Sequence, residues 1–553
     1  MKRVYGIDLG TTYSCIAWVD EHGKPVVIPN AEGEITTPSA VYFETADNIV
    51  VGQHAKDVAK VHEDRVVQTV KRVMGDPGWE LEYFEHVYKP QEISALILRK
   101  LVGDAQAERG ETIEDVVITC PAYFGATEKE ATRQAGIIAG LNVLYVIPEP
   151  TAAAIAYGLA LDQDQVVLVF DLGGGTFDVT VIKVSGGGIE VMATGGEKEL
   201  GGKDWDDAIV TYFAQEFENQ TGESVETLRS DLETYQELLL DAERCKRTLS
   251  NREKHTQRVR YGGESAAIEL TREKFDEITA SLLERTFSLT NEVLGRAREY
   301  GSENIDVVLL VGGSTYMPQI HDRVSREFSC EIKRIDPNQI VAKGAALFGY
   351  RCQLDQEIRI RVAEKTGVDA ETVEIDDTPA EIHDEAVREV ADAHGMALPN
   401  LKRLVDTEIT NVTSKSFGLV VIGEDGTKGV TNMVLVDDKV PKLIARPFST
   451  YEEGQNGVSI EVYENHDRQG EEVLLDLEQC TLLGAVELTF LRPLPKKSPL
   501  EVTFELTPDG LLKLHGRDLT TNQEIELEFK TESIMSSQEV DEARGKNLAM
   551  KVS

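Results

Sequence analysis

The sequence predicts an α/β domain built from two similar halves, followed by an antiparallel β-sandwich. Strand-like and helix-like stretches alternate from Met1 to about Tyr350, and a glycine-rich hairpin pattern occurs twice within that part. After about Arg403, apolar and polar residues alternate with period two, as in strands with one buried face. At 553 residues the chain exceeds a single hydrophobic core and should form several domains.

The two hairpin patterns share one arrangement. "VYGIDLGTTYSCIAWV" (Val4–Val19) places Asp8, a glycine and hydroxyl residues between apolar strands, and "VVLVFDLGGGTFDVTVIKV" (Val166–Val184) repeats this around Asp171 with three glycines. Glycine allows an anion to approach backbone amides closely. Either loop alone is equally explained as a strained turn with acidic flanks, but the repeat predicts two half-domains that each supply a hairpin and a carboxylate to one cleft.

The paired aspartates predict the ligand of this cleft. Two carboxylates from facing turns suit a hydrated Mg²⁺ ion, which keeps most of its waters while substrate phosphates complete its shell. The cleft is therefore predicted to bind a Mg-nucleotide. A Gly-x-x-x-x-Gly-Lys-Ser/Thr run is absent from the sequence, which excludes a P-loop.

Composition limits the partners and the compartment. The 97 acidic and 57 basic residues give a formal charge of −40, which opposes binding to nucleic acid or to an anionic membrane. An apolar signal segment and a membrane-spanning run are both missing from the sequence, so a cytoplasmic location is expected. The six cysteines are widely spaced and predict neither a metal site nor a disulfide framework.

Two helices are predicted from their capping signals. "ATEKEATRQAGIIAGL" has a capping box at Thr127 and Glu130 and a stop at Gly140. "TPAEIHDEAVREVADAHG" has Thr378 as the cap, a proline at the first helical position and a final glycine. The second helix lies within residues 361–395, which contain eleven acidic and three basic residues. This segment is therefore expected to be a short helix in a linker or in an inserted subdomain.

The C-terminal third predicts the sandwich. "GVSIEVYEN" and "LEVTFELTPDGLLKLHGRDL" read as strands, the latter turning at Asp509–Gly510. Past Thr531 the residues are polar and few, and a frayed tail is expected. The expected domains are residues 1–352 (nucleotide binding), 353–403 (acidic helical linker or insert), 404–531 (sandwich) and 532–553 (tail).

Seven motifs in fixed order resemble the ATPase domain of DnaK-type heat-shock chaperones: "GIDLGTTYSCIA", "VVITCPAYFGATEKEATRQAGIIAGL", "PEPTAAAIAYGLA", "FDLGGGTFDVTV", "LGGKDWD", "AERCKRTLS" and "VVLLVGGSTYMPQI". The resemblance covers roughly residues 1–350. A weaker one, carried by "SFGLVV", "RPFSTYEEGQNGVSIEVYEN" and "PLEVTFELTPDGLLKLHGRD", covers about 405–531. Together the two resemblances imply an actin-like (ribonuclease H-like, duplicated) ATPase domain followed by a β-sandwich peptide clamp.

The resemblance also implies roles for residues around the phosphates of ATP or ADP. Asp8 and Asp171 would hold Mg²⁺ through water, and Asp178 would lie beside a K⁺ ion. Lys71 would stabilise charge near the γ-phosphate, and Glu149 would orient the attacking water or the metal shell. The implied catalytic set is Lys71, Glu149, Asp171 and Thr176, and the implied phosphate hairpins are Gly10, Thr11, Thr12 and Tyr13, and Gly173, Gly174, Gly175 and Thr176.

The resemblance places adenosine between two further groups of residues. The first group, Glu243, Lys246, Arg247 and Ser250, has the spacing of one helix face. The others are Gly201, Gly202, Gly312, Gly313, Ser314, Tyr316 and Asn338. Tyr316 stands where the family usually has an arginine against adenine, and Asn338 where an aspartate is frequent, so the strength of adenine binding is open.

For the sandwich, the resemblance implies a peptide pocket at Leu419, Phe448, Val458 and Ile460; ordinary sandwich core explains these residues equally well. The implied partners are unfolded or extended apolar peptides and a nucleotide-exchange factor. The family's J-domain contact is in doubt because "LYVIPEP" has Tyr145 and Pro148 in place of an arginine and an asparagine. The family's apolar coupling linker and C-terminal helical lid are not found in the sequence.

Three functions remain open on these grounds. The first is an ATP-hydrolysing, peptide-binding chaperone. The second is a small-molecule kinase or a filament-forming ATPase on the same actin-like fold, since a fold alone does not determine function. The third is a nucleotide-gated binding module with little turnover.

Overall fold

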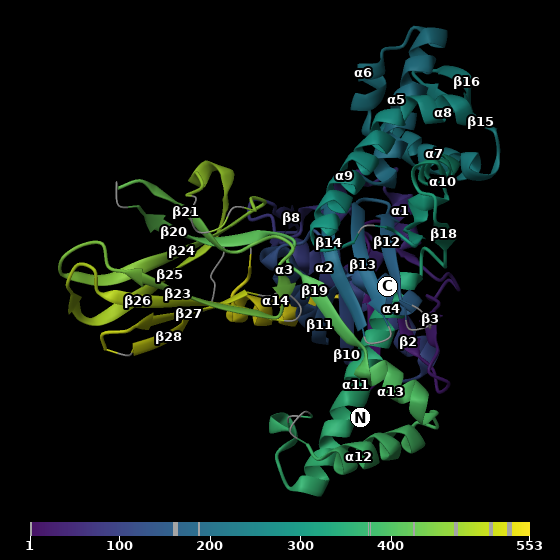
Figure 1. Ribbon diagram of the computed structural model, residues 1–553. Helices are drawn as coiled ribbons and strands as arrows, with labels where there is room; N and C mark the ends of the chain where they lie inside the picture. Colours follow the sequence, from purple (N-terminus) through teal and green to yellow (C-terminus); the bar gives the residue numbers. More distant parts are fainter. Residues whose placement is uncertain are drawn as a thin grey trace.

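A computed structural model describes residues 3–158, 164–185, 188–302, 304–373, 375, 378–423, 426–468, 470, 474–507, 512–521, 523–527 and 534–553. The chain is a mixed α/β protein with several sheets. Figure 1 shows a β-rich C-terminal part that projects from a larger α/β body. Among the helices of these ranges, none has the length and apolar character needed to cross a bilayer.

The first lobe of the α/β body surrounds a six-stranded sheet. Its elements are β1 (Val4–Asp8), β2 (Tyr13–Val19), β3 (Pro25–Ile28), β4 (Thr37–Pro38), β5 (Ala40–Phe43), β6 (Asn48–Val51), α1 (Gln53–Val58), β7 (Val66–Gln68), β8 (Leu81–Tyr83), β9 (His86–Tyr88), α2 (Pro90–Arg109), β10 (Asp115–Cys120), α3 (Ala126–Ile138) and β11 (Asn142–Pro148). The sheet order is β11-β10-β1-β2-β3, with β4 added beside β2. In this sheet β1 forms an antiparallel hairpin with β2 and pairs in parallel with β10, and Asp8 is the last residue of β1.

The second lobe repeats this design. It contains α4 (Glu149–Gly158), β12 (Gln165–Leu172), β13 (Phe177–Ser185), β14 (Gly188–Glu197), α5 (Gly202–Thr221), α6 (Val225–Ser230), α7 (Leu232–Asn251), β15 (Lys254–Tyr261), β16 (Glu264–Thr271), α8 (Arg272–Ile278), α9 (Ala280–Glu299), β17 (Val307–Val311), α10 (Pro318–Glu327) and β18 (Glu331–Arg334). The β12–β13 hairpin is antiparallel and β12 pairs in parallel with β17, as β1 does with β10. The repeated hairpin pattern of the sequence therefore corresponds to a repeated strand arrangement.

A long helix and the acidic insert complete this body. The helix α11 (Ile340–Thr366) runs through residue 352, so the domain boundary expected there falls inside a continuous helix. The insert helices are α12 (Ala380–Ala393) and α13 (Leu398–Asp406), and their buried Val387, Val390 and Leu401 join the same apolar cluster as α4 and α11. The insert is therefore a packed part of the body and not a free linker.

Both predicted helices are present, but their N-terminal caps differ from the prediction. In α3 the amide of Gly125 donates to Glu128 (3.1 Å), because Thr127 is buried inside the first turn and does not cap it. The helix α12 begins after Pro379, one residue later than a cap at Thr378 would place it. Gly140 and Gly395 have positive φ (87° and 61°) just past these helices, as the predicted stop signals require.

The C-terminal part consists of two four-stranded antiparallel sheets. One has the order β21-β20-β24-β25, and the other β23-β26-β27-β28. Their strands are β20 (Ser416–Ile422), β21 (Lys428–Val434), β23 (Lys442–Ser449), β24 (Gln455–Asn465), β25 (Thr481–Leu494), β26 (Pro499–Leu506), β27 (Leu512–Asp518) and β28 (Gln523–Leu527). Inward side chains of both sheets form one apolar core. The turn predicted at Asp509–Gly510 lies outside the described residues.

The sandwich is attached to the second lobe at its N-terminal side. The strand β19 (Glu408–Val412) leads into the sandwich and pairs in parallel with β14, and β22 (Lys439–Val440) pairs with β19 in turn. The seven-stranded sheet of the second lobe is therefore β18-β17-β12-β13-β14-β19-β22. Asp437 of the sandwich reinforces this attachment by an ion pair with Arg296 of α9 (3.1 Å).

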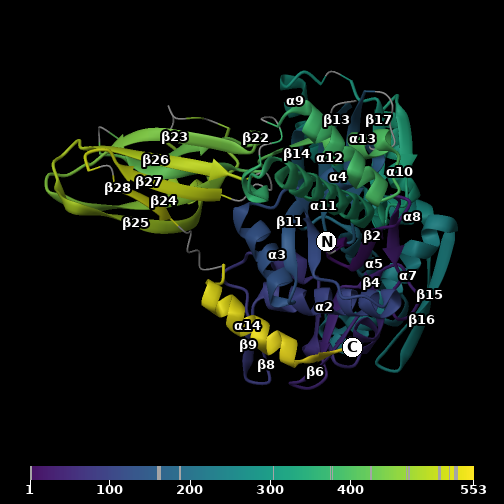
Figure 2. The ribbon, with the colours of Figure 1, turned by 90° about the horizontal axis from the view of Figure 1, so that it is seen from below.

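The expectation of a frayed tail is wrong. Residues after 534 form α14 (Ser537–Ala549) and β29 (Lys551–Val552), and β29 adds a parallel strand to β6 of the first lobe. Figure 2 shows α14 lying along α3 on the face of the first lobe. Met535, Val540 and Ala543 are buried in the first lobe's core, and Arg99 donates to the carbonyls of Asn547 and Met550. Tertiary packing thus orders a segment whose own sequence is too polar to fold alone.

Candidate functional site

A cavity of about 1260 Å³ lies between the two lobes. The predicted residues that line it are Asp8, Gly10, Thr11, Thr12, Tyr13, Lys71, Glu149, Asp171, Gly173, Gly174, Thr176, Glu243, Lys246, Arg247, Ser250, Gly312, Gly313, Ser314, Tyr316 and Asn338. Gly175, Gly201, Gly202 and Asp178 lie directly behind this lining, next to residues that belong to it. The structure therefore brings the predicted nucleotide site together in one place from both lobes.

The two glycine-containing hairpins meet tip to tip across the cavity. A Cβ on Gly174 would lie 2.0 Å from Oγ1 of Thr12, and a Cβ on Gly175 would lie 2.2 Å from Cγ2 of Thr11. Both glycines are therefore required by the close approach of the opposite lobe. The second hairpin is further held by α5, because the amide of Lys203 donates to the carbonyl of Gly174 (2.7 Å).

Buried charges gather beneath the hairpin tips. Lys71 forms an ion pair with Glu149 and both side chains are buried, as are Asp171 and Asp178. Burial and the charge of Glu149 raise the pKa of Asp8 to about 7, and the same effects raise the pKa of Asp171 and of Asp178. Burial lowers the pKa of Lys71, but the charges of Glu149 and Asp8 outweigh it, and the pKa rises.

This excess of buried carboxylates over positive charge suits a bound cation. A divalent ion at the mouth of the cluster would lower the energy of the ionised Asp8 and Asp171 side chains, which burial otherwise disfavours. In the part of the chain that the structure describes, no group of three His, Cys, Asp or Glu side chains is arranged to ligate a metal directly. Binding through water, which Mg²⁺ favours, is the mode that fits these two aspartates.

The four predicted residues of α7 lie along one side of the cavity and differ in their contacts. Glu243 accepts from Lys56 of α1, which belongs to the opposite lobe. Lys246 donates to the carbonyl of Gly202 (2.6 Å) and to Asp206 (2.8 Å), and so fixes α7 to α5. The Lys56–Glu243 pair thus connects the two lobes across the cavity mouth.

At the far end of the cavity, an aromatic ring stands where the resemblance leads one to expect an arginine. Tyr316 is 46% exposed, and the Arg334 guanidinium lies over its ring at 5.1 Å from the centroid. Asn338 faces Gly313, where its Oδ1 would be 3.0 Å from an added Cβ. The exposed ring presents a flat apolar surface to the cavity.

The four predicted peptide-binding residues all belong to the sandwich core. Leu419 and Ile460 are buried, and Phe448 and Val458 are half-buried against the same cluster. Leu419, Val458 and Ile460 come from β20 and β24 of one sheet, and Phe448 from β23 of the other. Both interpretations given above, a peptide pocket and ordinary core, predict this placement.

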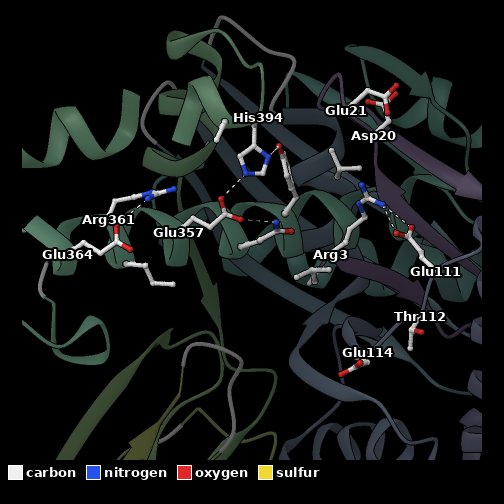
Figure 3. A pocket seen from close by; sticks show the side chains of 16 residues that line it. Arg3, Asp20, Glu21, Glu111, Thr112, Glu114, Glu357, Arg361, Glu364 and His394 are labelled. Atoms are coloured by element: carbon white, nitrogen blue, oxygen red, sulfur yellow. Dashed lines mark hydrogen bonds and ion pairs between the residues drawn. The ribbon is translucent and has the colours of Figure 1, made fainter. Parts of the chain in front are cut away.

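A second cavity of about 920 Å³ lies where the insert meets α11 and the first lobe (Figure 3). His394 at the end of α12 lies between Tyr350 (3.2 Å) and Glu357 (2.8 Å) of α11. Arg3 pairs with Glu111 (2.8 Å) at the other side of the cavity. Among the described residues, those that line it do not include the glycine hairpins or Lys71.

The sequence did not predict Lys56, which lines the larger cavity, or Arg72, which bonds to the hairpin beside it. Lys56 lies in α1 and Arg72 in the 3₁₀ turn Val70–Val73, and each bonds to a partner in the opposite lobe. The position of Arg72 directly after Lys71 was the one feature of the sequence that could have indicated its place beside the site. Lys56 is a lone lysine in a short helix, for which a solvated surface position is the usual expectation.

These features define the class of the protein: two lobes of repeated topology enclose a polar cavity with paired glycine hairpins, and a β-sandwich is attached to them. The Hsp70 protein family model matches residues 4–79, 75–353 and 378–552. The chain therefore belongs to the Hsp70 family, whose members are ATPases with a chaperone function and bind ATP or ADP with Mg²⁺.

Proposed function

We propose that this chain is an ATP-dependent chaperone that binds and hydrolyses ATP between its lobes and binds extended apolar segments of unfolded proteins in its sandwich. The two lobes are the halves of an actin-like ATPase domain, and residues 404–531 are the substrate-binding domain. The observation that carries this proposal is the pair of glycine hairpins that meet above Asp8 and the buried Asp171, Glu149 and Lys71.

The phosphates are held by both hairpins. Backbone amides and the hydroxyls of Thr11, Thr12 and Thr176 would bind them, and Asp8 and Asp171 would hold Mg²⁺ through water. When bound, the ion would supply positive charge against the phosphate oxygens, and Asp178, paired with Asp171 across the hairpin, would contribute to a K⁺ site. Lys71 stabilises the charge that develops on phosphoryl transfer, and Glu149, its ion-pair partner, orients the attacking water.

Adenosine occupies the other end of the cavity. The α7 residues and Ser314 contact the ribose and the base edge, and the exposed ring of Tyr316 stacks on the base. Arg334, whose guanidinium lies over that ring at 5.1 Å from the centroid, would fix its orientation.

Peptide binding in the sandwich requires a rearrangement. Because Leu419 and Ile460 are buried in the core, apolar side chains of a peptide reach them only when the surrounding loops open. An extended peptide segment then forms backbone hydrogen bonds with the sandwich, as a peptide does when it is added to a sheet as a strand. Leu419, Phe448, Val458 and Ile460 select its apolar side chains.

The proposal is tested by calorimetry of ATP and ADP with the full chain, followed by ATP turnover with and without an unfolded apolar peptide. Micromolar binding and turnover that rises with peptide are expected. Nucleotide binding with no turnover supports the nucleotide-gated binding module instead, and phosphorylation of an added small-molecule acceptor supports a kinase. The Lys71→Ala variant is the control that assigns turnover to this cavity.

A further inference from the structure

The 3₁₀ turn Val70–Val73 is connected to the second lobe by two side chains, that of Lys71, which is ion-paired to Glu149, and that of Arg72. The turn itself belongs to the first lobe, because Val70 and Met74 are buried in that lobe's core. From this turn Arg72 reaches the second lobe, where its Nε donates to the carbonyl of Gly175 (2.8 Å) and its Nη2 to Asp204 (2.8 Å).

The partners of Arg72 are the phosphate hairpin and the start of α5. Asp204 also accepts from the amide of Gly201 (2.7 Å), so the guanidinium, the helix start and the hairpin form one connected group. A guanidinium fork is the side chain that meets a carbonyl and a carboxylate at once with fixed geometry.

The hydrogen bond from Arg72 to the Gly175 carbonyl also orients the following amide, that of Thr176. In a trans peptide the carbonyl and the following N–H point in opposite directions, so fixing the Gly175 oxygen fixes the N–H of Thr176. Gly175 is not among the residues that line the cavity, whereas Thr176 is. Rotation of this peptide would instead turn a carbonyl dipole toward bound phosphate, which is electrostatically unfavourable.

The backbone that leads into the turn is strained. Thr69 has φ 57° and ψ 26°, a left-handed conformation that is unfavourable for a β-branched residue, and it lines the cavity. Such strain persists only where surrounding contacts fix the backbone. Val70 and Met74 fix it to the first lobe, and Arg72 fixes it to the second.

From this geometry we propose that Arg72 is a positioning residue for ATP hydrolysis: it sets the Lys71 ammonium of one lobe against the phosphate hairpin of the other. This proposal rests on the proposed ATPase function. Lys71 and Arg72 are adjacent on one turn, so the bridge from Arg72 to Gly175 fixes the separation of Lys71 from the hairpin amides. The contribution of Arg72 is to alignment in the transition state and not to affinity for ATP.

The test compares Arg72→Met with Arg285→Met. Arg285 also bonds a carboxylate, Glu197, and a backbone carbonyl, that of Glu199, but within the second lobe and away from the cavity. In single-turnover hydrolysis, Arg72→Met is expected to react roughly ten- to a hundredfold more slowly, the scale of a misplaced catalytic group. Its Kd for ATP should stay within about threefold of wild type, and Arg285→Met should leave both values unchanged. Arg72→Lys should recover part of the rate.

Two results would overturn the proposal: a loss of ATP affinity with an unchanged hydrolysis step, or a double variant Lys71→Ala/Arg72→Met whose rate losses multiply as for independent groups. Hydrogen exchange of the nucleotide-free protein provides a measurement that does not depend on turnover. Arg72→Met should speed exchange at the hairpin 173–177 and leave the hairpin 9–14 unchanged. If wild type does not hydrolyse ATP, the proposed function fails, while unchanged exchange at 173–177 refutes the bridge itself.

Discussion

Replacing Lys71 by alanine tests the centre of the proposed mechanism. Lys71 is buried among Asp8, Glu149, Asp171 and Asp178, and it is ion-paired to Glu149. Its ammonium can stabilise charge that builds up only as the phosphoryl group transfers, so its loss should affect the rate more than binding. Removing one preorganised charge-stabilising donor costs about 3–4 kcal/mol, which corresponds to a rate reduction of about a hundredfold or more.

The structure also predicts a cost to the folded state. Without Lys71, Glu149 becomes a buried carboxylate with no ion-pair partner at that site, and breaking a buried pair in this way destabilises by about 3–5 kcal/mol. The double variant Lys71→Ala/Glu149→Gln removes that unpaired charge and should recover most of the lost stability without recovering the rate. This separates loss of catalysis from loss of folding.

The assays are single-turnover hydrolysis of ATP, calorimetric Kd for ATP, and thermal unfolding of the three proteins. Lys71→Ala should bind ATP within about threefold of wild type and hydrolyse it about a hundredfold or more slowly. Unchanged turnover would remove Lys71 from the mechanism, and an equal loss in binding and in rate would make it a binding residue.

Four further outcomes are expected. Burial raises the pKa of Glu243, but the charge of Lys56 outweighs it, and the pKa falls to about 2. Because the pKa of this group in the unfolded chain is near 4.5, its carboxylate stabilises the fold by roughly 3 kcal/mol at pH values above 4.5. That contribution is lost as the pH falls toward 2. Glu243→Gln should flatten the decline of Tm below pH 4.5 and speed ADP release in stopped-flow, and an unchanged release rate would contradict a bridge across the cavity mouth. Val540→Asp should place a charge in the α14 interface and raise hydrogen exchange over residues 534–553 and β6, with ATP affinity unchanged; continued protection there would contradict the observed packing. A labelled apolar heptapeptide should leave quickly in both nucleotide states, with an off-rate ratio of about tenfold or less, and release over many minutes with ADP would show that another element closes the clamp. A generic J-domain should stimulate ATPase activity by less than about twofold, since Tyr145 cannot replace a guanidinium fork and instead packs on Phe348; a strong rise would refute this.

The local features of the cavity were predictable because they are encoded in short segments. A Gly-Gly-Gly turn between β-branched runs specifies a hairpin on its own, and the i, i+3, i+4, i+7 spacing from Glu243 to Ser250 places four side chains on one helix face. The remaining contacts depend on pairs far apart in the chain. Lys56 and Glu243 are separated by 187 residues, and Arg72 and Gly175 by 103. Such pairs have no signature in a single sequence.

The packing of the C-terminal tail also depends on residues far away in the chain and so could not be predicted from the sequence. Its helix offers few apolar residues, and Val540 and Ala543 alone do not predict burial. The complementary surface is supplied by α2 and α3, whose Arg99 and Gln134 bond to backbone groups of the tail, including the carbonyl of Met535 (2.7 Å). Polar composition correctly indicates that this segment does not fold alone, but it does not reveal a surface that orders it.

The two ends of the sandwich are therefore fixed to different lobes. At its N-terminal side β19 pairs with β14 of the second lobe, and at its C-terminal side α14 and β29 pack on the first. Release of the sandwich from the α/β body therefore requires both attachments to break, because each holds a different side of it.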